Sequence, residues 1–80
     1  MNVEQIIQHA FDHGVLVETK VYKDGTHSVV AQDGQSRHRR KAKRLRDALE
    51  QALCLVSFEW EDLDRAVAFR LAIPGTQEAP

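Results

Sequence analysis

The hydrophobic positions near the N-terminus recur at helical spacing. They follow the i, i+3, i+4, i+7, i+8 pattern of one helix face and are Val3, Ile6, Ile7, Ala10 and Phe11. Asn2 stands before them as a capping residue, and Gly14 stands where a glycine commonly ends a helix. The pattern predicts a helix between these two residues.

The next stretch alternates between apolar and polar residues. In residues 15–22 the valines and Thr19 share one face, whereas Glu18 and Lys20 point the other way, as in a half-buried strand. Asp24-Gly25 predicts a two-residue hairpin turn, because both turn positions favour positive φ. The return strand then covers residues 27–32. In this register Val21 faces Ser28 and Thr19 faces Val30.

A second helical pattern follows Asp33-Gly34. Ser36 is an N-cap candidate, and seven apolar residues then share one face at spacings of three and four. They are Ala42, Leu45, Ala48, Leu49, Ala52, Leu53 and Val56. The pattern predicts a second helix that starts at Ser36.

The last third fits two structures. Residues 56–61 and 66–73 each alternate apolar and polar or small residues, which predicts a second hairpin joined at residues 62–65. The alternative is a helix over about residues 62–71, because Leu63, Val67 and Leu71 share a helical face. We favour strands because the alternation is unbroken, because Phe69 fits only that pattern, and because Pro74 pushes Ile73 toward an extended backbone.

These elements predict an α+β domain in the order α-β-β-α-β-β, with antiparallel strands and helices on one face. The chain has 80 residues, so we expect one domain over residues 1–73 and a flexible C-terminal tail over 74–80. No apolar run approaches the roughly 18 residues of a membrane helix. No signal peptide is evident, and the single Cys54 fits a reducing compartment, so we expect a cytoplasmic protein without a membrane partner.

Charge divides the chain sharply. Residues 37–46 hold seven of the eleven lysines and arginines and none of the twelve carboxylates, although the formal net charge of the whole chain is −1. The seven are Arg37, Arg39, Arg40, Lys41, Lys43, Arg44 and Arg46. Such a run is often only a solvated helix face. Here, however, the cations would oppose the helix dipole and repel one another within a Debye length of about 8 Å. A polyanion or an acidic surface would relieve both effects, so these residues are the candidate binding site.

Nucleic-acid phosphate is the first candidate partner, and five of the seven cations are arginines, which suit bidentate phosphate contacts. About five phosphate contacts would give a log–log salt slope near −4 to −5 on duplex DNA. Gly34-Gln35-Ser36, the basic residues and Ala42-Lys43 resemble the end of a double-stranded-RNA-binding domain over about fifteen residues. That family also starts with a helix and places a basic helix N-terminus over phosphates. In the predicted order one strand is missing before that helix, and a hairpin follows where the family ends, so the resemblance serves only as an analogy.

An acidic protein surface is the second candidate partner, and the pI near 6.4 favours it over a dedicated nucleic-acid binder. The chain also contains an acidic counterpart, which could pair with the basic segment across the two-fold axis of a homodimer or within one molecule. Its residues are Asp47, Glu50, Glu59, Glu61, Asp62 and Asp64. In size and charge the chain is similar to small regulators such as phage-type inhibitors and antitoxins.

Other residues predict little chemistry. His9 and His13 have the i, i+4 spacing of a metal pair, but nothing places two further ligands beside them. Cys54 lacks the signature of a nucleophile, and Trp60 is interpreted as core. No catalytic motif is present. We therefore predict a non-enzymatic binding or regulatory module without cofactor or metal. Its leading function is contact with nucleic-acid phosphates through a basic helix N-terminus, and the alternative is a regulator or inhibitor that binds a protein.

Overall fold

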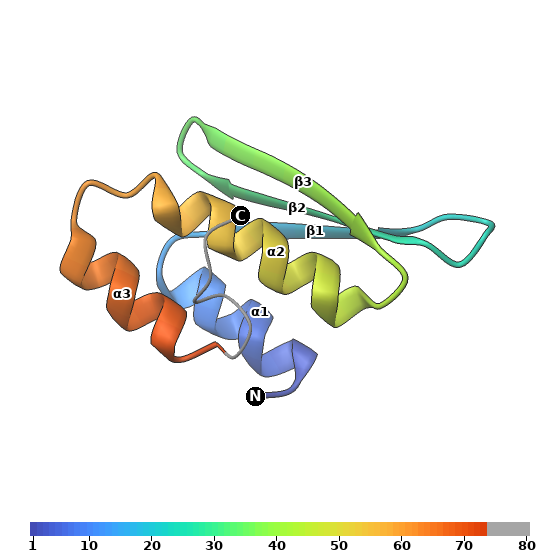
Figure 1. Cartoon of the computed structure of the whole chain (residues 1–80), viewed down its shortest axis with the longest axis horizontal. Helices are drawn as coiled ribbons and strands as arrows, with labels where there is room; N and C mark the ends of the chain where they lie inside the picture. Colours follow the sequence, from blue (N-terminus) through green and yellow to red (C-terminus); the bar gives the residue numbers. More distant parts are fainter. Residues whose placement is uncertain (74–80) are drawn as a thin grey trace.

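The computed structural model describes residues 1–73, in which three helices lie on one side of a three-stranded antiparallel sheet (Figure 1). The elements are α1 Val3–Asp12, β1 Leu16–Val21, β2 His27–Asp33, β3 Ser36–Ala42, α2 Leu45–Phe58 and α3 Leu63–Leu71. The predicted α+β class, with antiparallel strands and helices on one face, is confirmed. The predicted order is wrong in its second half, because the chain runs α-β-β-β-α-α. The predicted tail at 74–80 lies outside the described residues.

Helix α1 forms as its sequence predicts. The Asn2 side chain accepts from the Gln5 amide at 2.9 Å, and the Gln5 side chain accepts from the Asn2 amide at 2.8 Å, which completes a capping box. Gly14 follows the helix with φ of +84°, a conformation that glycine adopts without steric cost. Ile6 and Ala10 are fully buried, so the predicted apolar face is the one that meets the core.

The first hairpin forms, but its predicted register is wrong by one residue. Gly25 donates to the Tyr22 carbonyl at 3.0 Å and has φ of +87°, so the loop holds three residues rather than two. The observed pairs are Val21 with His27 and Thr19 with Val29. Because side chains alternate along a strand, this shift turns β2 over. Val29 and Ala31 therefore face the helices, and Ser28 and Val30 face away.

The start of the predicted second helix is instead the third strand. Gly34, with φ of +61°, and Gln35 form a tight turn that pairs Asp33 with Ser36. A glycine with positive φ at the first central position is typical of a type II′ hairpin, which directs the chain back along β2. Ser36 is therefore a strand residue and not an N-cap. Helix α2 begins nine residues later, at Leu45, and buries the apolar stripe that the sequence predicts from Ala48 to Val56.

The predicted second hairpin is wrong, and the helical alternative is correct. Helix α2 continues through Val56 to Phe58, and Trp60 is buried one turn after Val56. The Asp62 side chain then accepts from the Arg65 amide at 3.0 Å and caps α3. Phe69 does fit a helix, because Ala66, Phe69 and Ile73 follow helical spacing and are all buried.

The core lies between the sheet and the helices. Helix α2 packs on β2 and β3, α1 packs on β1, and α3 packs on α2 (Figure 1). None of the three helices of residues 1–73 covers the opposite face of the sheet, which we call the outer face (Figure 1). Within residues 1–73, no helix combines the length and the apolar composition that a bilayer crossing requires.

Candidate functional site

The basic segment of residues 37–46 does not form a helix N-terminus. Its first half is β3, which is an edge strand of the sheet, and only Lys43, Arg44 and Arg46 flank the start of α2. The predicted order had one strand fewer before this helix than a double-stranded-RNA-binding domain has. The structure contains that strand, which is β3. The cations of that segment nevertheless lie mainly on the strand, so the predicted basic helix N-terminus is wrong as a description of the site.

Alternation along β3 divides its cations between two faces. Val30 faces away from the helices and pairs with Arg39, so Arg37, Arg39 and Lys41 lie on the outer face. Arg40 pairs with the core residue Val29 and therefore lies on the opposite side of the strand, although it is exposed. Neighbouring cations on the outer face are two residues apart, which is about 7 Å along a strand.

Strand β1 adds to the same face. Lys20 pairs with Ser28, which pairs in turn with Lys41, so these three residues form one row across the sheet. Among the strand residues on the outer face, Glu18 is the only carboxylate, and its oxygen lies 3.9 Å from the Arg37 guanidinium. The strands therefore present four cations and one anion on the outer face, a net positive surface that no helix in the described part of the chain covers (Figure 1).

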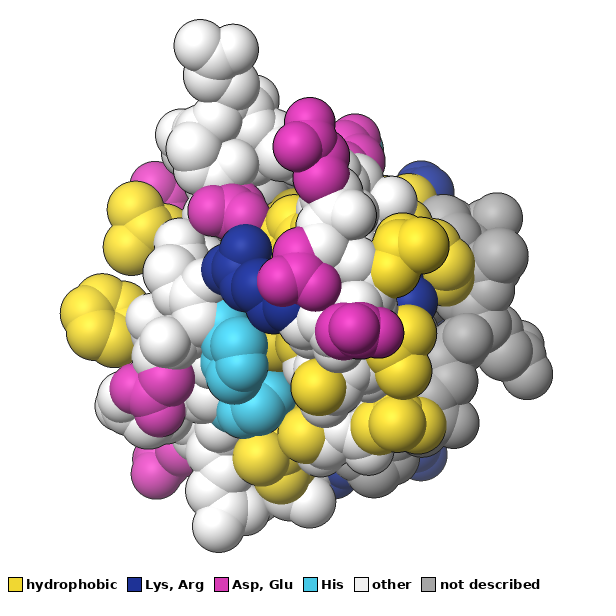
Figure 2. Space-filling view, turned by 90° about the vertical axis from the view of Figure 1, so that its left-hand side faces the viewer, with side chains coloured by type: hydrophobic (Ala, Val, Ile, Leu, Met, Phe, Trp, Pro, Cys, Tyr) yellow, Lys and Arg dark blue, Asp and Glu magenta, His cyan; other side chains and the backbone are white. Residues whose placement is uncertain are grey.

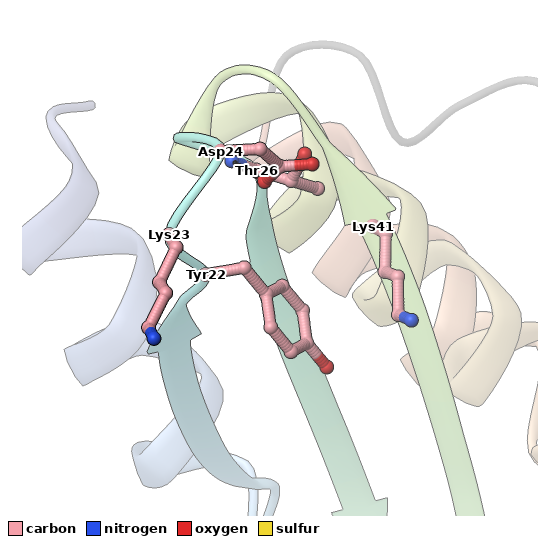
Figure 3. Close-up of a pocket in the computed structure, with 5 residues that line it drawn as sticks. All are labelled: Tyr22, Lys23, Asp24, Thr26 and Lys41. Carbon is pink, nitrogen blue, oxygen red and sulfur yellow. Dashed lines mark hydrogen bonds between the residues drawn. The ribbon is translucent and has the colours of Figure 1, made fainter.

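Tyr22 lies at one end of this face. The ammonium groups of Lys41 and Lys20 lie 4.9 and 5.1 Å from the centre of its ring. A hydrogen bond with Ser28, with smaller contributions from the nearby charges of Lys41, Lys20 and Arg39, lowers the pKa of the Tyr22 phenol. Figure 3 shows the ring lying beside Lys41, next to a hollow at the hairpin tip. The hollow is lined by Tyr22, Lys23, Asp24, Thr26 and Lys41.

Few of the predicted site residues are neutralised by a neighbour. Arg37 also donates to the Gln32 side chain at 3.0 Å, and Arg46 pairs with Glu50 at 2.9 Å. Lys41 contacts the Tyr22 ring. Four further cations have no ion pair and no side-chain hydrogen bond within residues 1–73. They are Arg39, Arg40, Lys43 and Arg44. Their charge is therefore available to an external anion.

The other side of β3 is fixed to α2. Ser36 donates a hydrogen bond to the Glu59 carboxylate, and His38 Nε2 lies 2.7 Å from the other oxygen of that carboxylate. These two contacts lower the pKa of Glu59. They position the strand from the helix side, so that its odd-numbered side chains are held toward solvent.

The predicted acidic surface is partly used within the molecule. Glu50 and Glu59 have basic partners, and Asp62 caps α3. Asp47, Glu61 and Asp64 are exposed. Figure 2 shows carboxylates on this end of the molecule, around a pair of histidine side chains and beside exposed hydrophobic groups. The basic and acidic surfaces therefore do not neutralise each other completely in one chain.

His9 and His13 belong to an aromatic cluster with Phe69 and Trp60. The rings of His9 and His13 lie 4.5 Å apart, and His9 stacks on Phe69 at 5.0 Å. Burial, and secondarily the neighbouring His13, lower the pKa of His9. The Arg65 guanidinium lies 3.7 Å from the centre of the Trp60 ring and donates to the His13 carbonyl. Among the described residues, no group of three or more metal-ligating side chains occurs.

Cys54 is buried in α2, and burial raises the pKa of its thiol. A protonated thiol away from solvent is unsuited to nucleophilic attack.

The sequence interpretation missed two residues of the outer face, Lys20 and Tyr22. The alternation of β1 already placed Lys20 opposite the apolar face, and the same period extends to Tyr22. The sequence therefore placed both residues on the polar side of the first strand. That side is a basic surface only together with the cations of residues 36–42, which form β3.

Comparison with known proteins found no matching family model, no matching curated protein and no matching solved structure.

Proposed function

We propose that this chain is a non-enzymatic binding module that contacts nucleic-acid phosphates through the outer face of its sheet. The observation that supports the proposal most strongly is the set of four cations on that uncovered face, Lys20, Arg37, Arg39 and Lys41, with Glu18 as their only carboxylate neighbour on the strands. A surface of this charge attracts a polyanion and gains affinity from counterion release.

Protection of an exposed sheet edge is the simpler explanation of charge on β3, because charged side chains discourage pairing with another chain. Edge protection needs no particular sign of charge. Strand β1, the other edge, carries Glu18 beside Lys20, whereas β3 carries only cations. Like charges about 7 Å apart repel one another, so a mixed edge would give the same protection without that cost. Phosphate binding explains the uniform sign.

The test compares the wild-type protein with an Arg37→Gln, Arg39→Gln, Lys41→Gln variant in a fluorescence-anisotropy titration. Labelled single-stranded and duplex DNA and RNA serve as probes at low salt. These side chains are exposed or paired only at the surface, so circular dichroism and thermal unfolding should stay close to the wild type. We expect the wild type to bind and the variant to lose at least tenfold in affinity. A folded variant that keeps wild-type affinity would refute the proposal.

A protein partner is the second candidate function, and the surface of α3 favours it. Leu63, Val67 and Leu71 are 70%, 45% and 65% exposed and share one helical face, and Phe58 at the end of α2 is also exposed. This apolar stripe beside carboxylates is typical of a protein-binding surface more than of a phosphate-binding one. If no nucleic acid binds, Leu63→Gln with Val67→Gln should abolish recovery of a partner protein in a pull-down, and the triple outer-face variant should not.

A further inference from the structure

The outer face combines cations with one aromatic ring, and this combination specifies a class of ligand. Tyr22 is half-buried just after β1, and the ammonium groups of Lys41 and Lys20 lie within about 5 Å of the centre of its ring. Figure 3 shows this ring beside Lys41. The hairpin loop holds the backbone that carries this ring, because the Tyr22 amide donates to the Thr26 carbonyl at 2.9 Å and the Tyr22 carbonyl accepts from the Gly25 amide at 3.0 Å. A ring held in this way loses little conformational freedom when a planar group stacks on it.

The geometry of the cations favours a single strand over a duplex. Arg37, Arg39 and Lys41 form a row along β3, and Tyr22 lies at the Lys41 end of that row. In a duplex the bases are stacked on one another, so the ring of Tyr22 would have no base to contact. A single strand exposes both its phosphates and its base faces. A basic surface that follows the backbone, with an aromatic ring on which a base stacks, is the general arrangement for binding single strands.

We infer that the outer face binds single-stranded nucleic acid, with a base stacked on Tyr22 and the adjoining phosphates held by the row of cations on β3. This inference rests on the proposed function and adds the strand type and the stacking residue. The stacked base replaces an ammonium group at the ring, so Lys20 or Lys41 moves from Tyr22 to a phosphate of the same segment. The hollow beside Tyr22 provides room for the neighbouring nucleotide.

The test uses two probes of equal length, a labelled decathymidylate and a labelled abasic deoxyribose-phosphate decamer, which has the charge but no bases. Wild type, Tyr22→Leu and Tyr22→Phe are titrated with both. Loss of one stacked base should weaken binding of the decathymidylate to Tyr22→Leu by roughly 5- to 150-fold. Binding of the abasic probe should change less than about twofold, because stacking contributes nothing to it. Tyr22→Phe keeps the ring and should bind like the wild type.

A second measurement needs no variant. Tyr22 is the only tyrosine of the chain, so its ring proton resonances are readily assigned. They should shift upfield when decathymidylate is added and stay in place with the abasic decamer. A decauridylate run in parallel shows whether RNA is bound in the same way, and a shift with either polymer supports the inference.

The outcomes separate the inference from the proposed function. If the triple outer-face variant loses binding but Tyr22→Leu binds both probes like the wild type, phosphate contact stands and stacking is refuted. Equal or tighter binding of a ten-base-pair duplex would refute the preference for single strands. If the wild type binds none of the probes at low salt, both proposals are overturned.

Discussion

Arg39 and Arg40 are neighbours in sequence but lie on opposite sides of β3, so they form a matched pair for testing the face that binds. Arg39 pairs with Val30 on the outer face, and Arg40 pairs with the core residue Val29. Both side chains are exposed, and neither has an ion pair or a side-chain hydrogen bond within residues 1–73. Replacing either with Gln removes one positive charge and leaves the net charge of the two variants equal.

The expected magnitude follows from the number of phosphate contacts. Four cations on the outer face give a log–log salt slope of about −2.8 on a single strand, since each contact contributes about −0.7. Arg39→Gln should reduce this slope to about −2.1. Arg40→Gln should leave it near −2.8, because its charge lies on the other side of the sheet and is largely screened at distances beyond about 8 Å.

The assay is an anisotropy titration of labelled decathymidylate at four salt concentrations between about 50 and 200 mM, a range in which such slopes are well defined. Both variants should unfold at the wild-type temperature, because an exposed substitution changes the free energy of unfolding by no more than about 0.5 kcal/mol. Equal slopes for the two variants would refute the assignment of the site to the outer face. A larger effect from Arg40→Gln would place the site on the helix side of β3.

Three further predictions concern the fold. Phe69→Ala should lower the free energy of unfolding by about 3–5 kcal/mol, because Phe69 is fully buried. Leu71→Ala should lower it by no more than about 0.5 kcal/mol, because Leu71 is 65% exposed. Similar losses for the two variants in urea denaturation would favour the hairpin, in which both residues share one face, over α3. His9 should make the protein less stable as the pH falls from about 7 to 5, because its pKa is lowered in the folded state and protons then bind preferentially to the unfolded chain. His9 is surrounded by His13, Asp12 and the Phe69 backbone, and His9→Gln should flatten this pH dependence of the unfolding free energy; an unchanged profile would contradict it. The pKa of Glu59 is lowered in the folded state, so its contacts with Ser36 and His38 should stabilise the fold at a pH above the ordinary carboxyl range and weaken as the pH falls below that range. An acid unfolding midpoint that is unchanged in Glu59→Gln would contradict this contribution.

The N-terminal helix and the first hairpin could be predicted because their signals are local. Asn2, the apolar spacing and Gly14 together define α1 without any tertiary information. The hairpin register could not be predicted to the residue. Asp24-Gly25 fits both a two-residue and a three-residue loop, and the extra residue decides which face of β2 meets the core.

Strand β3 could not be predicted from its own composition. Residues 36–42 contain no β-branched or large aromatic residue, and charged residues of this kind are common in helices. Pairing with β2 and the contacts of Ser36 and His38 with Glu59 determine the strand, and Glu59 is more than twenty residues away in sequence. The basic segment was therefore identified correctly as a concentration of charge, but the face that its residues share is visible only in the structure.

Helix α3 shows why a period-two pattern alone is insufficient. Val67, Phe69 and Leu71 alternate with small or charged residues, yet only Phe69 is buried. The apolar stripe that did show helical spacing, Leu63, Val67 and Leu71, is the exposed side of α3. Burial of Ala66, Phe69 and Ile73 in the core decides the structure, with the Phe69 ring against Trp60 and against His9 of α1. The small Ala66 gives little hydrophobic signal in the sequence.

The most direct measurement of the binding face is an amide and side-chain chemical-shift titration of the isotope-labelled wild-type protein with decathymidylate. The proposal predicts that the shifted resonances cluster on β1, β2 and β3, with the guanidinium of Arg39 and the ring of Tyr22 among the largest changes, and that α1 and α3 stay unperturbed. Shifts confined to α3 around Leu63, Val67 and Leu71, or no shifts at low salt, would contradict it.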